Sequence, residues 1–182
     1  MVAAAYSAQV TIARGPGDAW LECACGRRHW GRFGAAGLLL ARTAPDDGRW
    51  QVLLQHRALW SDQGGTWGLP GGALREGEEP VHGALREAAE EVGIDPAHVA
   101  VRGVHVVDHG PWRYTTALGL ATGPQEPYAA DDETLAAEWV DLDDVPARPL
   151  LIAFSAAWPT LRARIEDGGL APDDDGYARR SR

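Results

Sequence analysis

The stretch from Gly72 to Ile94 reads GALREGEEPVHGALREAAEEVGI, and it predicts a loop followed by the clearest helix of the chain. Pro80 suits the first turn of a helix, and Gly93 suits the left-handed position that often ends one. Between them, apolar residues recur every three or four positions, which indicates one buried helical face. These apolar residues are Val81, Ala84, Leu85, Ala88 and Val92.

The same predicted helix carries three carboxylates away from its apolar face. At 3.6 residues per turn, Glu87, Glu90 and Glu91 fall within an arc of roughly 100°. Like charges at this spacing repel one another, so the patch is either a solvated acidic surface or a cation site. The Gly71–Gly72 turn and the loop residue Glu78 favour the cation site, because they add backbone and carboxylate oxygens nearby. A hard divalent cation such as Mg²⁺ prefers such oxygen ligands.

Written as a spacing, this stretch is Gly72, five residues, Glu78, seven residues, and then the run Arg86–Ile94, which reads REAAEEVGI. It resembles the signature of the Nudix (MutT-like) hydrolases, with every charged and glycine position met. Ala88 is smaller than the aliphatic residue often found there. The preceding WGLPG at 67–71 and the segment EWVDLDDVP at 138–146 also resemble family features, and the resemblance extends over residues 35–165 or so.

The resemblance implies an α/β/α sandwich around a mixed β-sheet. It also implies hydrolysis of the pyrophosphate linkage of a nucleoside diphosphate derivative, by attack of water at phosphorus. Nucleoside triphosphates, oxidised nucleotides and nucleotide conjugates all remain open as substrates. The implied cofactor is Mg²⁺, and Mn²⁺ suits the same oxygen ligands. The alternative is a catalytically silent Nudix-fold module that binds or senses a nucleotide, although such modules usually lose the glutamates that are present here.

The resemblance also assigns roles to individual residues. Glu87, Glu90 and Glu91 match metal ligands, and Gly71 matches a ligand through its backbone carbonyl. Glu78 and Arg86 match a supporting pair that fixes the loop against the helix. The general base varies across the family, so five candidates stay open: the helix glutamates Glu87 and Glu90, and the later acidic residues Asp132, Glu133 and Glu138.

Residues for substrate binding are harder to select. Arg57 and Arg113 could each contact a phosphate with two hydrogen bonds, or pair with surface carboxylates instead. Aromatic residues in or near the predicted loops could stack on a base, or pack beneath those loops. These aromatic candidates are Trp60, Trp67, Trp112 and Tyr114.

Working outward, the rest of the chain predicts mostly strands. Apolar runs at 35–42 and 50–56 flank a Pro-Asp-Asp-Gly turn and predict a β-hairpin. Further strands are expected at 99–108, 114–121 and 136–140, and a helix, interrupted or kinked near Trp158–Pro159, at 149–165. The pattern predicts an α+β or α/β fold with a mixed sheet covered by helices.

The domain organisation follows from the same pattern. Residues 35–167 are expected to form the Nudix domain, and residues 1–34 an N-terminal extension that packs on it, with a short strand at 10–12. Residues 168–182, which include three consecutive aspartates, are expected to form a solvated or disordered tail.

Composition limits the partners. The chain of 182 residues has 17 basic residues, all arginine, against 26 acidic ones, for a formal charge of −9. This balance argues against a nucleic-acid partner, because phosphate contacts along a duplex need a basic face. A small nucleotide substrate remains possible, since bound cations can supply the positive charge. The absence of a signal-peptide pattern and of long apolar runs predicts a cytoplasmic protein with no membrane partner, and a homodimer is possible.

The cysteines form a single short motif. Cys23 and Cys25 are separated by one residue, so a disulfide between them would be strained and free thiols are expected. Together with His29 they offer three zinc ligands, whereas a structural zinc site requires four. The sequence therefore favours packing of this segment on the sheet over a zinc site.

Overall fold

A mixed seven-stranded sheet organises the computed structural model of the chain, which describes residues 17–23 and 25–170. The central path of this sheet runs β5-β4-β3-β8-β7, with β6 paired to β3 and β9 paired to β4. The strands are β3 (Ala35–Thr43), β4 (Trp50–Arg57), β5 (Trp67–Gly68), β6 (Gly71–Ala73), β7 (Val99–Asp108), β8 (Arg113–Ala121) and β9 (Thr134–Asp141).

The central strand β3 has no polar side: residues 35–41 are all buried. It runs parallel to β8, in a register from Ala35 opposite Tyr114 to Ala41 opposite Leu120, and antiparallel to β4 and β6. A strand covered on both faces reads as a continuous apolar run instead of an alternating one. This explains why the run that begins at Ala35 is so uniformly apolar.

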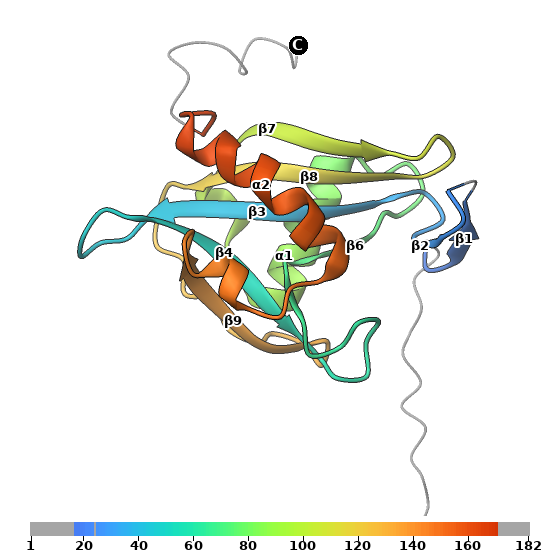
Figure 1. Cartoon of the computed structure of the whole chain (residues 1–182), viewed down its shortest axis with the longest axis horizontal. Coiled ribbons are helices and arrows are strands. Elements are labelled where there is room, and N and C mark those ends of the chain that lie inside the picture. Colours follow the sequence, from blue (N-terminus) through green and yellow to red (C-terminus); the bar gives the residue numbers. More distant parts are fainter. Residues whose placement is uncertain (1–16, 24, 171–182) are drawn as a thin grey trace, which may run out of the picture.

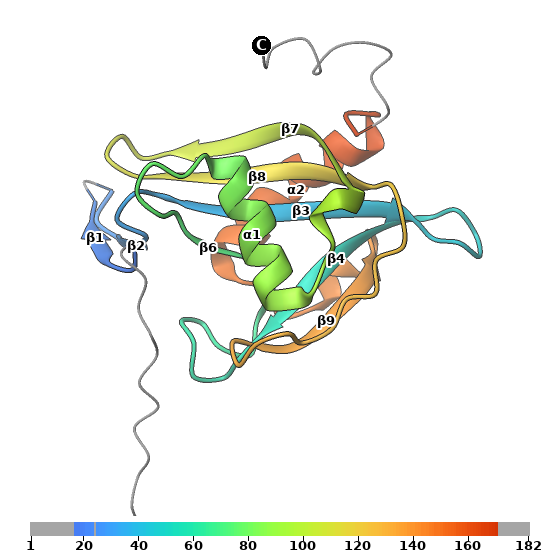
Figure 2. The same cartoon turned by 180° about the vertical axis from the view of Figure 1, so that it is seen from behind.

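Two helices, α1 (Pro80–Val92) and α2 (Ile152–Glu166), cover opposite faces of the sheet, as Figures 1 and 2 show. Leu38, Leu40 and Leu53 belong to a core with α1, while Leu39, Val52 and Leu54 belong to a core with α2. The alternation along β3 therefore divides its side chains between two cores. The predicted α/β/α sandwich around a mixed sheet is confirmed.

The hairpin strands β3 and β4 diverge soon after their turn. They are paired only between 41–43 and 50–52. Beyond this point β5 pairs with β4 at Gln55 and His56, while β9 pairs with β4 from Gln51 to Arg57. The space beside the first residues of β3 is taken by β6, with Gly37 opposite Gly71 and Ala36 opposite Gly72. This divergence carries the Gly71–Gly72 turn to the middle of the sheet.

The chain before β3 forms a small separate hairpin of β1 (Trp20–Glu22) and β2 (Arg28–Trp30). Both views place it beside the turn between β7 and β8 (Figures 1 and 2). The strand expected at 10–12 lies outside the described residues. No helix among residues 17–23 and 25–170 is both long and apolar enough to cross a membrane.

The C-terminal segment differs from expectation at both ends. The helix predicted at 149–165 begins at Ile152, because Trp67 of β5 exchanges backbone hydrogen bonds with Pro149 and Leu151. It then continues through Pro159 without a break. Leu170, expected in a solvated tail, is fully buried in the core on the α2 side, so the packed body extends at least to this residue. Residues 171–182 lie outside the described part of the chain.

Candidate active site

The Gly71–Gly72 turn presses directly against β3 and α1. A Cβ on Gly71 would overlap the carbonyl oxygen of Ala36, and one on Gly72 would lie 2.6 Å from Glu87 Oε2. The Gly71 N–H donates a hydrogen bond to Glu91 Oε2 at 2.7 Å. Glycine is therefore needed at both positions, because it lets the turn approach the carboxylates of α1 closely.

Arg86 links the loop before α1 to the carboxylates on it. Its Nε and Nη2 donate to the two oxygens of Glu78 at 2.7 and 2.8 Å, in a bidentate ion pair. Its Nη1 lies 2.6 Å from Glu87 Oε1 and 3.1 Å from Glu90 Oε2. The hydrogen bonds from Arg86 lower the pKa of Glu78 to about 2. The expected contact between Glu78 and Arg86 is therefore present, and it attaches the loop before α1 to the helix.

Two carboxyl groups of α1, those of Glu87 and Glu91, lie in poorly solvated surroundings. Glu91 is only 4% exposed, and its pKa is raised to about 8, first by burial and then by the charge of Glu87. Burial also raises the pKa of Glu87, against the opposing effect of Arg86. Buried carboxylates that resist ionisation are stabilised as anions by a nearby cation. Their chemistry fits a hard divalent metal, with Glu90 and the Gly71 carbonyl as the other candidate ligands.

A second set of side chains reaches the carboxylates from β4, β8 and the loop before β9. The charge of Glu133 contributes to the raised pKa of Glu87, so the loop faces the patch on α1. The pKa of Glu133 is itself raised, first by burial and then by Asp131, and Arg57 acts in the opposite direction. Burial followed by the charge of Glu91 raises the pKa of the Tyr114 hydroxyl. Glu133, Arg57 and Tyr114 are thus brought together at this site.

Glu138 lies elsewhere. Its neighbours two residues away on β9, Ala136 and Val140, pack in the core on the α2 side, and its carboxylate pairs with Arg148 at 2.7 Å. Among the later acidic residues, the structure therefore favours Glu133 over Glu138 as a member of the site.

Two of the candidate substrate-binding residues, Trp67 and Arg113, lie away from the carboxylates of α1. Trp67 is 5% exposed, with His56 stacked on its ring at 4.6 Å and the Arg148 guanidinium 4.5 Å from the ring centroid. Its prediction as a stacking residue for a base is corrected, because β5 turns it into the core. Arg113 is exposed and pairs with Asp108 at 2.8 Å across the β7–β8 hairpin.

The other two aromatic candidates differ in their exposure. Trp112 is 8% exposed and packs on His29 instead of lining the site. Trp60 is 54% exposed in the loop after β4.

Sequence reasoning missed Gln55, which is fully buried on β4. Its Nε2 donates to Thr134 Oγ1 at 2.8 Å, and a side-chain hydrogen bond from it lowers the pKa of Glu91. The available signal was a polar residue directly after the apolar run Val52–Leu54, because a buried amide needs polar partners.

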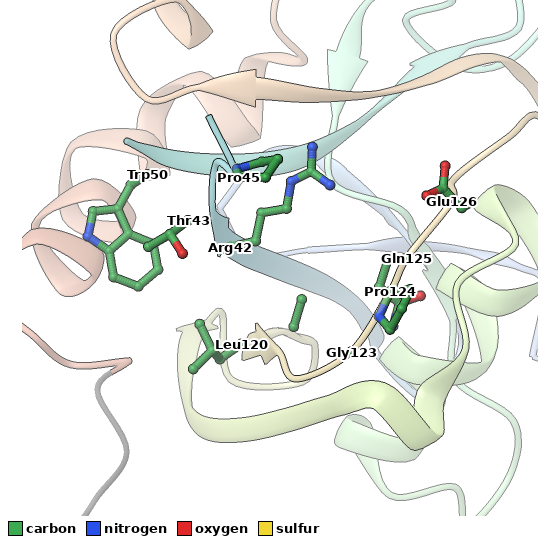
Figure 3. Close-up of a pocket in the computed structure, with 10 residues that line it drawn as sticks. Arg42, Thr43, Pro45, Trp50, Leu120, Gly123, Pro124, Gln125 and Glu126 are labelled. Carbon is green, nitrogen blue, oxygen red and sulfur yellow. The ribbon is translucent and has the colours of Figure 1, made fainter. Parts of the chain in front are cut away.

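A separate hollow of about 400 Å³ lies at the far end of the sheet, between the ends of β3 and β8 (Figure 3). Its lining includes Arg42, Trp50, Leu120 and Glu126. Because β6 pairs with the first residues of β3, the hollow lies at the end of β3 opposite to Gly71. It is therefore distinct from the carboxylate site.

Comparison with known proteins agrees with this geometry. The sequence profile of the NUDIX domain matches residues 33–160. A Mycobacterium tuberculosis protein named "Putative 8-oxo-dGTP diphosphatase 3" is 44% identical over 94% of this chain and 79% of its own length. A Bifidobacterium longum nucleoside triphosphate pyrophosphatase/Nudix hydrolase fusion protein is 51% identical over 84% of this chain, which spans only 32% of that longer protein.

Among solved structures, the Nudix hydrolase RenU from M. smegmatis superimposes with a TM-score of 0.76 at 41% identity, covering 83% of this chain and 96% of that one. The domain match spans well over half of the chain, and relatives more than 40% identical align along most of it. This chain therefore belongs to the Nudix hydrolase family.

Proposed function

We propose that the chain hydrolyses the pyrophosphate linkage of a small nucleotide with the help of Mg²⁺ or Mn²⁺. The observation that carries this proposal is the gathering of Glu87, Glu90 and Glu91 beside the Gly71–Gly72 turn, with the carboxyl group of Glu91 buried. A solvated acidic surface would not bury a carboxylate to 4% exposure beside a second one. The arrangement is suited to holding a cation against a polyanionic substrate.

The substrate class is proposed from a relative. The Mycobacterium tuberculosis protein is named for 8-oxo-dGTP, and its alignment covers 94% of this chain. We therefore take an oxidised guanine nucleoside triphosphate as the first substrate to test. Arg57, which lies within the electrostatic reach of Glu133 and Tyr114, is the candidate for phosphate binding.

Each protein group has a proposed part in the reaction. A bound divalent cation supplies charge neutralisation at the phosphates and lowers the pKa of a water ligand. Arg86 holds the Glu87 and Glu90 side chains in place, and Glu78 holds Arg86. Glu133 is the proposed general base: it accepts a proton from water while the water oxygen bonds to phosphorus and the bond to the bridging oxygen breaks. Burial raises the pKa of its carboxyl, which makes the Glu133 carboxylate a stronger proton acceptor than an exposed glutamate.

The first experiment is a panel of nucleotides assayed with Mg²⁺ for release of phosphate and pyrophosphate. The panel contains ordinary and oxidised nucleoside triphosphates, ADP-ribose, NADH, nucleotide sugars and diadenosine polyphosphates. We expect 8-oxo-dGTP to be hydrolysed, and Glu90→Gln to lower kcat by about 100-fold or more, a typical effect of losing a directly acting carboxylate. Glu90 is 52% exposed at its side chain, so this substitution should leave the fold intact.

Glu76→Gln is the matched control, because Glu76 is an exposed glutamate in the loop that leads to α1. It should keep full activity. If no nucleotide is hydrolysed but Mg²⁺-dependent nucleotide binding persists, the chain is the silent binding module and the proposed hydrolysis is wrong.

A further inference from the structure

Four metal-binding side chains meet where the β1–β2 hairpin lies beside the turn between β7 and β8 (Figure 1). Cys23, Cys25 and His29 come from the β1–β2 hairpin, and His109 comes from the turn between β7 and β8. One ligand atom from each lies within 4.8 Å of all the others. The sequence offered only three of these ligands, and the fold supplies the fourth from a position about 80 residues further along the chain.

The backbone around the two cysteines is tightly turned. The Cys23 N–H donates to the Arg27 carbonyl at 3.0 Å, and the Gly26 N–H donates to the Cys23 carbonyl at 2.9 Å. Gly26 has a φ of +79°, a conformation that suits glycine. The Cys25 N–H points at Cys23 Sγ, at 3.5 Å. A backbone donor aimed at sulfur stabilises a thiolate, which is the form of cysteine that binds metal.

The histidines are held from both sides. The ring of His29 stacks on Trp112 at 4.2 Å with an interplanar angle of 11°, and lies 4.6 Å from the ring of His109. Trp112 is itself fixed by a hydrogen bond from its Nε1 to the Trp30 carbonyl at 3.0 Å. His29 Nε2 is 3.2 Å from Cys25 Sγ. The two hairpins therefore present their ligands to one point.

We propose that Cys23, Cys25, His29 and His109 form a structural zinc site that fastens the β1–β2 hairpin to the β7–β8 hairpin. Two thiolates and two imidazoles are the ligands that zinc takes in closed tetrahedral sites, whereas Mg²⁺ prefers oxygen. Zinc–sulfur bonds of about 2.3 Å and zinc–nitrogen bonds of about 2.0–2.1 Å put neighbouring ligand atoms about 3.3–3.8 Å apart. Cys25 Sγ and His29 Nε2, 3.2 Å apart, already lie close to the lower end of that range. All four ligand atoms lie within 4.8 Å of one another, so small side-chain movements would bring the other pairs to the same separation.

Binding is a simple exchange of ligands. The two thiols lose their protons to solvent as zinc–sulfur bonds form, and the two histidines bind as neutral imidazoles. No ligand position is left for substrate, so the role of the site is to stabilise the fold. The zinc site is also linked to the active site through β8. Trp112, which packs on His29, precedes Tyr114 by two residues, and the charge of Glu91 contributes to the raised pKa of Tyr114.

The test measures zinc in the full-length protein, purified under a non-metal-binding reductant and equilibrated with excess Mg²⁺ to occupy the carboxylates. We expect about one zinc per chain by elemental analysis. Cys25→Ser and His109→Gln should each reduce the zinc content at least tenfold, since each removes one of four ligands. His105→Gln is the matched control, because His105 lies on β7 outside the cluster and its replacement should retain zinc.

A second readout identifies the ligands. Cobalt(II) exchanged into the wild-type protein should give a sulfur-to-cobalt charge-transfer absorption and the intense visible bands of tetrahedral cobalt. Cys25→Ser should weaken the charge-transfer band, while a Glu87→Gln/Glu90→Gln double variant should leave it unchanged. The proposal is overturned if zinc-loaded wild-type protein retains no zinc after gel filtration. It is equally overturned if both ligand variants retain as much zinc as the wild type.

Discussion

At the scale of single residues, the contact between Gly72 and Glu87 makes a demanding test of the active-site geometry. Gly72 lies on β6 opposite Ala36 and faces the Glu87 carboxylate. A methyl group there would lie 2.6 Å from Oε2 and 2.7 Å from Cδ, which are distances that real Cβ atoms do not tolerate. Since the obstacle is the end of a flexible side chain, the carboxylate must move while the backbone can stay.

We therefore expect Gly72→Ala to separate activity from stability. Turnover should fall by about 10- to 100-fold, because small misplacements of reacting groups carry costs of this size. The free energy of unfolding should change by less than about 1 kcal/mol. Gly103→Ala is the control, since nothing lies within 4 Å of a Cβ at Gly103 on β7. A variant that unfolds easily, or one as active as the wild type, would contradict this account.

Single residues also show where sequence reasoning succeeds and fails. The resemblance to the Nudix signature predicted the pairing of Glu78 with Arg86, because the signature is a local pattern that places both residues in the loop and the helix. It could not predict that Trp67 is buried between His56 and Arg148, because both partners come from distant segments. Gln55 was missed for the same reason, since its role depends on Thr134 and Glu91.

At the scale of elements, the pair between Glu78 and Arg86 attaches the loop after β6 to α1. The helix has no side-chain hydrogen bond at its N-terminal cap, so this ion pair is a main link between the loop and the first half of the helix. Both side chains are well buried, at 14% and 17% exposure. Loss of one partner leaves a poorly solvated charge on the other.

The strength of this link should depend on pH. The pKa of Glu78 is about 2 in the folded chain, below the ordinary value of 4.5 that applies when the chain is unfolded. The pair therefore stabilises the fold fully above about pH 4.5, and this stabilisation is lost as the pH falls towards 2. We expect Glu78→Gln to lower the free energy of unfolding by about 1–3 kcal/mol at neutral pH.

Urea unfolding of both proteins across the acid range checks this expectation. The difference between wild type and Glu78→Gln should shrink below about pH 4.5, because Glu78 takes up a proton in the unfolded chain while it is still ionised in the folded one. Glu76→Gln, in the same loop but exposed, should show no such convergence. If the difference in free energy of unfolding between wild type and Glu78→Gln stays constant down to about pH 2.5, the pair does not stabilise the fold through its charge.

The long elements could be read from the sequence and the short ones could not. α1 and the strands β3, β4, β7 and β8 have periodicity or apolar runs of their own, and their predicted ranges agree closely with the structure. β5 and β6 have two and three residues and exist only because β4 and β3 pair with them. Likewise, the pairing of Trp67 with residues 149–151 delays the start of α2.

At the scale of the whole molecule, the packed body extends past the last helix. Leu170 is fully buried among residues of α2 and the sheet, although four charged or glycine residues precede it. The segment after α2 thus closes the core on that side of the sheet. No periodicity marks such a single anchoring residue, which explains why the sequence assigned it to a tail.

Leu170→Ala should therefore destabilise the protein by about 2–5 kcal/mol, the usual cost of removing a buried leucine side chain. Ile152→Ala serves as the control, because Ile152 begins α2 but is 66% exposed. Thermal unfolding of both variants is sufficient to compare them. Equal melting temperatures would show that Leu170 does not contribute to the core.

The whole fold also completes two clusters of side chains that the sequence showed only in part. The cysteine motif lacked a fourth ligand until the β7–β8 turn placed His109 beside it. In the same way, Glu133 reaches the carboxylates of α1 only because β9 pairs with β4. Contacts between residues this far apart are set by topology, which a local pattern does not contain.

The parallel pairing of β3 with β8 has a consequence for how the chain folds. The hairpins β3–β4 and β7–β8 close short loops and can form early, whereas joining β3 to β8 closes a loop of about 80 residues. Such non-local pairing raises contact order and slows folding. α1 lies within that loop and packs on both strands. The pairing of β3 with β8 and the carboxylate site should therefore form in the same late, rate-limiting event.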